Sequence, residues 1–103
     1  MHVISQKPFK DAVKKYPNHA DAITAAYKSL KQGTFKTPEE LKMQFGSLDN
    51  FKYKDKWWVI DIAGNHLRLI AFIEFRAGKM FVKHIVPHGE YDKLCKRYAK
   101  GEI

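Results

Sequence analysis

Several features that define other classes of protein are missing from this sequence. Cys95 is the only cysteine, which excludes an intramolecular disulfide and favours a reducing compartment. The longest apolar run covers residues 69–73, far short of the roughly 20 apolar residues that cross a bilayer. Residues 1–10 hold no apolar signal-peptide core. We therefore expect a small cytoplasmic protein, complete from Met1, with no membrane contact.

The chain also has no internal repeat, no low-complexity segment, no Gly-rich phosphate loop and no Ser nucleophile elbow. Its 103 residues suffice for one domain, spanning residues 1–103, around one modest core. What it has in excess is positive charge: 19 Lys and Arg against 11 Asp and Glu give a net charge of +8. No polybasic tail carries this excess, so a basic surface must be assembled by folding. Such a surface favours a polyanionic partner, nucleic acid first, although a purely solubilising role is the alternative.

The first half of the chain carries helical patterns. Residues 7–17 place apolar side chains at helical spacing, with Pro8 suited to the first turn and Pro17 ending the helix. Asn18 is placed to cap a second helix, which Gly33 ends. The remaining expected elements are a short β-rich run at 2–5, a short helix or helical turn at 37–45 and a loop at 46–50.

The second half changes to the alternating pattern of β-strands. Three strand-like runs cover residues 51–62, 66–75 and 79–86, and short turn sequences suggest that hairpins join them. A final helix is expected over residues 90–100. The order β-α-α-β-β-β-α predicts an α+β fold, with helices on one face of a meander sheet and the other face partly open.

Alternation assigns the strand residues to two faces. The middle run places Leu67, Leu69, Ala71, Ile73 and Phe75 on the face toward the helices. The second face receives His66, Arg68, Ile70, Phe72 and Glu74 from the same run. Adjacent Trp57 and Trp58 point to opposite faces, so one ring is expected in the core and the other is free to stack on a base or meet a protein partner. Lys83 and His84 are likewise expected on opposite faces.

Arg68 is the first candidate for chemistry because it lies in mid-strand among apolar neighbours on the second face. A guanidinium is a rigid, always-charged fork that binds a phosphate through two hydrogen bonds. The alternative is a structural ion pair with Asp61 or Glu74.

The third strand ends in the segment 84–94, HIVPHGEYDKL, which holds the second candidate group. If a helix begins near Gly89, then His88, Tyr91 and Asp92 stay close at i, i+3 and i+4. Histidine transfers protons near neutral pH, and a tyrosine hydroxyl orients a substrate. The alternatives are a helix cap with Tyr91 in the core, and a metal site made by His84, His88 and Asp92, which the strand-to-helix geometry disfavours.

Four segments resemble the HigB family of bacterial toxins. KKYPNH lies in the first half of the chain, DNFKY and GNHLRLIA in the middle, and HGEYDK near the end. Each piece alone is a weak signal, but their combination at the family's spacing is specific and covers almost the whole chain. HigB toxins are RelE-superfamily mRNA interferases of type II toxin–antitoxin modules.

The resemblance implies a RelE-like fold with a curved, mainly antiparallel sheet packed against two N-terminal helices. It implies endoribonuclease cleavage of mRNA without a metal or other cofactor, commonly on the translating ribosome. It also implies a HigA-like antitoxin with a helix-turn-helix, through which the toxin would contact operator DNA only indirectly. By position, the residues that match the family's catalytic set are Arg68, His88, Tyr91 and Asp92. The residues expected to contact RNA are Lys54, Lys56, Trp57, His66 and Lys83.

The expected mechanism is attack of the RNA 2′-hydroxyl on the adjacent phosphorus. Arg68 would bind the phosphate, and His88 would act as general acid or base. Tyr91 would orient or supplement His88, while Asp92 would hold His88 or contact a base. One departure from the family is Pro87, where a Thr is more common; Pro87 removes a hydroxyl and an N–H from the site. The alternatives are a non-catalytic module that binds RNA or the ribosome, and a metal-dependent nuclease.

Overall fold

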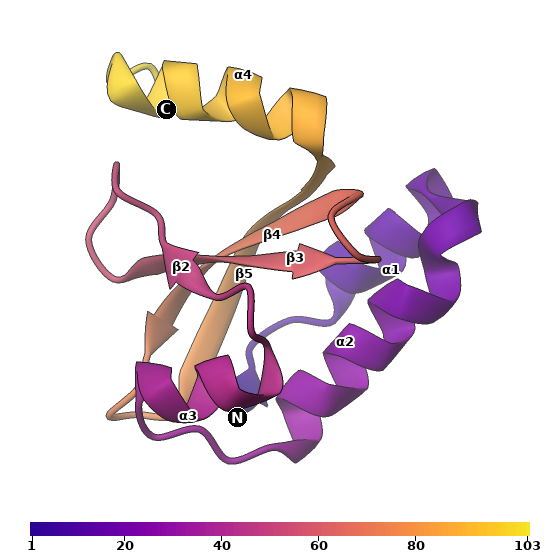
Figure 1. Cartoon of the computed structure of the whole chain (residues 1–103), viewed down its shortest axis with the longest axis vertical. Coiled ribbons are helices and arrows are strands. Elements are labelled where there is room, and N and C mark those ends of the chain that lie inside the picture. Colours follow the sequence, from indigo (N-terminus) through magenta and orange to yellow (C-terminus); the bar gives the residue numbers. More distant parts are fainter.

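The computed structural model describes all 103 residues, which form a five-stranded sheet and four α-helices (Figure 1). None of the helices is both long and apolar enough to cross a membrane. In chain order the elements are β1 (His2–Val3), α1 (Lys7–Lys15), a 3₁₀ turn (Pro17–His19), α2 (Ala20–Gln32), α3 (Pro38–Gln44), β2 (Asp49–Asn50), β3 (Trp57–Ile62), β4 (Leu67–Glu74), β5 (Lys79–Pro87) and α4 (His88–Ala99).

The strands follow the order β1-β5-β4-β3-β2, and every pair is antiparallel except β1 with β5. Tight turns join β3 to β4 and β4 to β5, with positive φ angles at Ala63, Gly64 and Gly78. The predicted α+β class, the two hairpins and the mainly antiparallel sheet are confirmed. A bulge in β5 falls opposite the junction of Ile70 and Ala71, where the register shifts.

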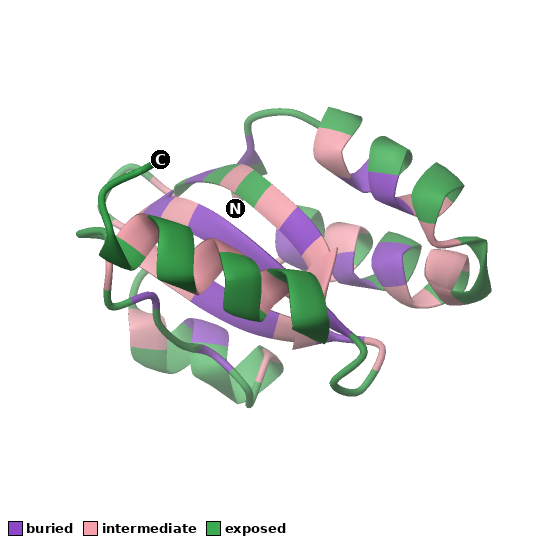
Figure 2. Cartoon of the chain, turned by 90° about the horizontal axis from the view of Figure 1, so that it is seen from above, coloured by how far each residue is buried: buried purple, intermediate pink, exposed green.

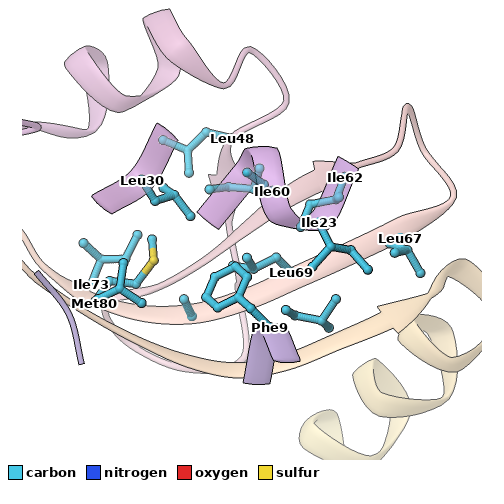
Figure 3. Packing of buried hydrophobic residues seen from close by; sticks show 14 of the residues in the cluster. Phe9, Ile23, Leu30, Leu48, Ile60, Ile62, Leu67, Leu69, Ile73 and Met80 are labelled. Carbon is cyan, nitrogen blue, oxygen red and sulfur yellow. The ribbon is translucent and has the colours of Figure 1, made fainter. Parts of the chain in front are cut away.

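The main core fills the space between one face of the sheet and the helices. Figure 3 shows Phe9, Ile23 and Leu30 of the helices directed at sheet residues such as Ile60 and Leu69. The four β4 residues predicted for this face all belong to the cluster: Leu67, Leu69, Ala71 and Ile73. The alternation in the sequence therefore assigned the two faces of β4 correctly.

The second face is less open than predicted because α4 lies across it. Figure 1 shows α4 on the opposite side of the sheet from α1 and α2, and Figure 2 shows its outer surface exposed. A smaller core under this helix contains Phe51, Val59 and Ile70. The α4 side chains that pack on it are Tyr91, Leu94, Cys95 and Tyr98. Any ligand of this face must therefore bind beside α4, at its ends or edges.

Three local predictions were wrong. The first strand-like run begins only at Trp57, because residues 51–56 fold into turns and Lys56 has a φ of 61°. Its alternating Lys and aromatic residues mimic a strand, but residues 51–56 have no partners in the strand register. Asn18 does not cap α2, since Pro17 starts a 3₁₀ turn that makes His19 the N-cap residue. Residues 49–50, expected as loop, pair with β3.

Candidate active site

Arg68 lies near the start of β4, directly opposite Asp61 of β3. Its Nη1 forms an ion pair with Asp61 Oδ1 at 2.5 Å, and only 16% of its side chain is exposed. The same nitrogen lies 3.5 Å from the backbone oxygen of Asn65 in the hairpin. The structural ion pair considered from sequence is thus present, with Asp61 rather than with Glu74, and it leaves Nη2 for another partner.

That other partner is His88. Arg68 pairs with Val86, so His88, two residues further along the chain, is its diagonal neighbour on the same face. Arg68 Nη2 and His88 Nδ1 are 3.0 Å apart. An arginine can only donate, so Nδ1 accepts, and the proton of the neutral imidazole is on Nε2. Asp92 Oδ2 lies 3.7 Å from that Nε2, one helical turn along α4.

Tyr91 completes the group. Its ring lies 5.7 Å from Cζ of Arg68, which is cation–π distance, and contacts Phe51 edge-on at 6.4 Å. Burial raises the pKa of Tyr91 to about 12, the neighbouring Cys95 adds to this, and the guanidinium of Arg68 opposes it. The hydroxyl is therefore protonated at neutral pH and is suited to donating a hydrogen bond, not to accepting a proton as a base.

The structure brings all four predicted residues together, although 20 positions separate Arg68 from His88. The capping part of the alternative is wrong, because Pro87 is the N-cap residue and no side chain caps α4. Its other part agrees with the structure, since Tyr91 packs on the smaller core. The arrangement joins a guanidinium, which can bind an anion, to an imidazole, which can transfer a proton. Asp61 and Asp92 flank this pair: Asp61 forms an ion pair with the guanidinium, and Asp92 lies within one helical turn of the imidazole.

Three of the five predicted RNA-contacting residues gather around Tyr98, at the far end of α4. Trp57 packs its ring edge-on against Tyr98 at 5.5 Å, and Lys54 lies 5.7 Å from the Tyr98 ring centroid. The ammonium of Lys83 lies 5.7 Å from the Trp57 ring and 5.9 Å from Phe81. We call Lys54, Trp57, Lys83, Phe81 and Tyr98 the aromatic–lysine surface. Phe51 connects it to the active site, since its ring contacts both Tyr91 and Tyr98.

The other two predicted contacts lie elsewhere. Lys56 forms an ion pair with Glu74 at 2.8 Å, and their hydrogen bond raises the pKa of Lys56 and lowers the pKa of Glu74. Lys56 borders a hollow of about 1020 Å³ lined by residues 50–58 and 73–77. This hollow lies at the C-terminal end of β4, whereas Arg68 lies near the N-terminal end of the same strand. His66 stacks on His19 with ring centroids 5.1 Å apart. Neither side chain joins the aromatic–lysine surface.

The structure does not assemble the metal site considered from sequence. His84 Nε2 lies 2.7 Å from the hydroxyl of Tyr98, whereas His88 contacts Arg68 and Asp92. No group of three His, Cys, Asp or Glu residues is placed to hold a metal ion. Burial, with Lys83 and Arg97 nearby, lowers the pKa of His84.

Sequence reasoning missed the hydrogen bond between His84 and Tyr98 and the central position of Phe51. It also placed Lys83 and His84 on opposite faces, yet both reach aromatic rings of the second face. The β5 bulge is the reason, because an extra residue in one strand shifts the alternation by one. The helical spacing of apolar residues in α4 predicts that Tyr98 packs against the sheet. No pattern in the sequence shows the position of the β5 bulge, so the face of His84 was not predictable.

Comparison with known proteins gives one family. The model of the HigB toxin family, described as the RelE-like toxic component of a toxin–antitoxin system, matches residues 19–94. An mRNA interferase HigB of Escherichia coli (strain CFT073) is 49% identical over 102 residues, which cover 99% of both chains. An mRNA interferase HigB of Shigella flexneri is 46% identical over 92 residues, covering 89% of this chain and 88% of that protein. The family match contains every residue of the candidate active site.

Proposed function

This chain belongs to the HigB toxin family of RelE-like toxic components of toxin–antitoxin systems, and from that premise we propose that it is an mRNA interferase, an endoribonuclease that cleaves mRNA. The observation that carries this proposal is the contact of Arg68 with His88, which joins an anion-binding group to a proton-transfer group. The net charge of +8 supports a polyanionic substrate.

The proposed reaction is attack of the RNA 2′-oxygen on the adjacent phosphorus. The new P–O bond forms as the bond to the 5′-oxygen breaks, and the departing oxygen takes a proton from water. The products are a cyclic phosphate and a 5′-hydroxyl. In the free protein Arg68 Nη2 occupies the lone pair of His88 Nδ1. A scissile phosphate that draws Nη2 to itself would free that lone pair to take the 2′-hydroxyl proton. Arg68 would then stabilise the charge that develops on the phosphorane oxygens.

The other two residues support this step. His88 directs its Nε2 toward the Asp92 carboxylate, 3.7 Å away, which would orient the ring toward the substrate. Tyr91, protonated because burial raises its pKa to about 12, would donate a hydrogen bond to the substrate or to the departing oxygen. No step requires a metal ion or another cofactor.

The aromatic–lysine surface is the proposed grip on the RNA flanking the cut. Bases stack on aromatic rings, and Lys side chains neutralise phosphates, in many proteins that bind single strands. Trp57 and Lys83 provide one such ring and cation in contact. We assign Lys56 a smaller role, because Glu74 already neutralises it. The same basic surface would dock on ribosomal RNA if cleavage takes place on the ribosome.

The proposed partner is a HigA-like antitoxin whose helix-turn-helix binds operator DNA, so that the toxin contacts DNA only through it. The proposed setting is the cytoplasm, where mRNA is translated. A non-catalytic module that blocks translation is the second candidate, and the aromatic–lysine surface favours it, since rings and cations in contact can bind RNA without cutting it.

Primer extension on a translated message separates the two candidates. The proposal predicts defined new 5′ ends in the presence of the parent chain, and none with Arg68→Ala or His88→Ala. Growth arrest without new 5′ ends would instead establish the non-catalytic module.

A further inference from the structure

One edge of the sheet is almost unpaired. The edge strand β1 contains only two residues, which pair with Lys79 and Met80 of β5. The last backbone hydrogen bond from the N-terminal segment to β5 runs from Ile4 N–H to the Met80 carbonyl, after which the chain turns into α1. The outer edge of β5 from residue 82 to residue 87 therefore has no neighbouring strand.

This edge presents both hydrogen-bond donors and acceptors. Met80 directs its carbonyl outward to Ile4, so alternation directs the backbone groups of Val82 outward too. Beyond the bulge, His84, Ile85 and Val86 lie opposite Ile70, Leu69 and Arg68 of β4. Because antiparallel pairs alternate, we infer that Ile85 is the residue that directs its backbone N–H and C=O outward. Lys residues often guard such edges, but the ammonium of Lys83 lies over Trp57 and Phe81 on the second face.

A groove of about 410 Å³ runs between this edge and α1. Lys7 and Lys15 of α1 line it, and its one acidic residue, Asp11, is already paired with Lys7 at 2.7 Å. Tyr16 also lines it, and the Tyr16 hydroxyl is buried without a hydrogen-bond partner. Such a buried, unpaired hydroxyl is rare and costly, so a bound group that hydrogen-bonds to it would gain stability by removing that cost.

We propose that the β5 edge and the α1 groove form the docking site of an extended acidic segment of the antitoxin, which adds to the sheet as a strand; the identity of this partner rests on the proposed function. Strand addition satisfies backbone donors and acceptors together, and about five residues span the edge. RNA phosphates offer only acceptors, so RNA fits this edge poorly. A second copy of the chain is disfavoured by its own charge of +8 and by the Lys residues of the groove.

The test uses the full chain and the protein encoded by the reading frame beside its gene. The binding variants are Lys15→Glu, which reverses a groove charge, and Tyr16→Phe, which removes the unpaired hydroxyl. Lys14→Glu is the matched control, because it makes the same charge change in the last turn of α1 but does not line the groove. We expect Lys15→Glu to weaken binding about tenfold and Tyr16→Phe about fivefold, whereas Lys14→Glu changes it less than twofold.

Two readouts separate this docking site from a structural role. Tyr16→Phe leaves the free chain as stable as the parent or more stable, since no hydrogen bond is lost. In the complex, the amide protons of Val82 and Ile85 exchange more slowly than in the free chain. Equal binding by Lys15→Glu and Lys14→Glu, or unchanged exchange at both amides, overturns the docking site.

The proposed function is tested separately by mRNA cleavage without antitoxin. Cleavage by Lys15→Glu at the parental rate supports a site for the antitoxin alone. Loss of cleavage in that variant, with antitoxin binding intact, assigns the groove to RNA and overturns the docking proposal. A parent chain that cleaves no mRNA and is bound by no antitoxin contradicts the proposed function itself.

Discussion

Arg68 donates through Nη2 to Nδ1 of His88 across 3.0 Å, while its Nη1 is paired with Asp61 at 2.5 Å. The guanidinium of Arg68 thus forms a cross-strand ion pair through one nitrogen and a hydrogen bond to His88 through the other. The ion pair fixes the side chain, so the position of Nη2 is set before a substrate arrives. In the proposed reaction, a phosphate competes with His88 for that nitrogen.

Arg68→Lys should lower the rate of mRNA cleavage about as much as Arg68→Ala, at least roughly a hundredfold. A lysine keeps the charge, but it has no second nitrogen to reach the phosphate while the first pairs with Asp61. Single-turnover cleavage of a translated message measures the effect, with circular dichroism to verify folding. Arg76→Ala, in the β4–β5 turn, is the control and should cleave like the parent. Parental activity in Arg68→Lys would contradict the claim that Arg68 binds Asp61 with one nitrogen and the phosphate with the other.

Tyr91→Phe should lower the cleavage rate only about tenfold, from the lost hydrogen bond, which is less than the loss expected for a general acid or base. The pKa of Tyr91 is raised to about 12, so its hydroxyl stays protonated as the pH rises from 7 to 10. An ultraviolet titration of tyrosinate in the parent, minus that in Tyr91→Phe, should therefore show no ionisation of this residue below about pH 11. A tyrosinate that appears near pH 8 would make Tyr91 a general base after all.

Lys83→Ala should weaken RNA binding more than Lys56→Ala does. Lys83 has a Trp57 ring beneath it and no acidic partner, whereas Lys56 is paired with Glu74. Loss of one phosphate contact lowers the slope of log K against log salt concentration by about one unit. Fluorescence anisotropy with a labelled single-stranded RNA at several salt concentrations measures both slopes. Equal effects of the two substitutions would contradict the assignment of the aromatic–lysine surface.

His84 should make the folded protein lose stability as the solution becomes more acidic. Burial lowers the pKa of His84 below its ordinary value of 6.5, so the folded state favours the neutral ring. That contribution is complete above about pH 6.5 and is lost as the pH falls through 6.5 toward the lowered pKa. Urea denaturation at pH 7.5 and pH 5 measures the free energy of unfolding at each pH. From pH 7.5 to pH 5 that free energy should fall less in His84→Gln than in the parent. An equal loss would contradict this role.

Patterns with a fixed period were predictable from sequence, and long-range packing was not. Alternation placed Arg68 on the second face, and local spacing grouped His88, Tyr91 and Asp92. Neither pattern shows that α4 folds back over the sheet, because that depends on Phe51 and the apolar residues it meets there. Charge alternation also made residues 51–56 resemble a strand, and side-chain pairing separated Lys56 from the RNA surface.

The central claim is that His88 transfers a proton from the 2′-hydroxyl of the RNA, without a metal ion. The most direct test is single-turnover cleavage of one message with and without a single 2′-deoxy residue at the cut site, in the presence of EDTA. We expect the parent and the control His66→Ala to cut only the all-ribose message. His88→Ala should cut that message roughly a hundredfold to ten-thousandfold more slowly. Cleavage of the 2′-deoxy message, or parental cleavage by His88→Ala, would contradict the claim.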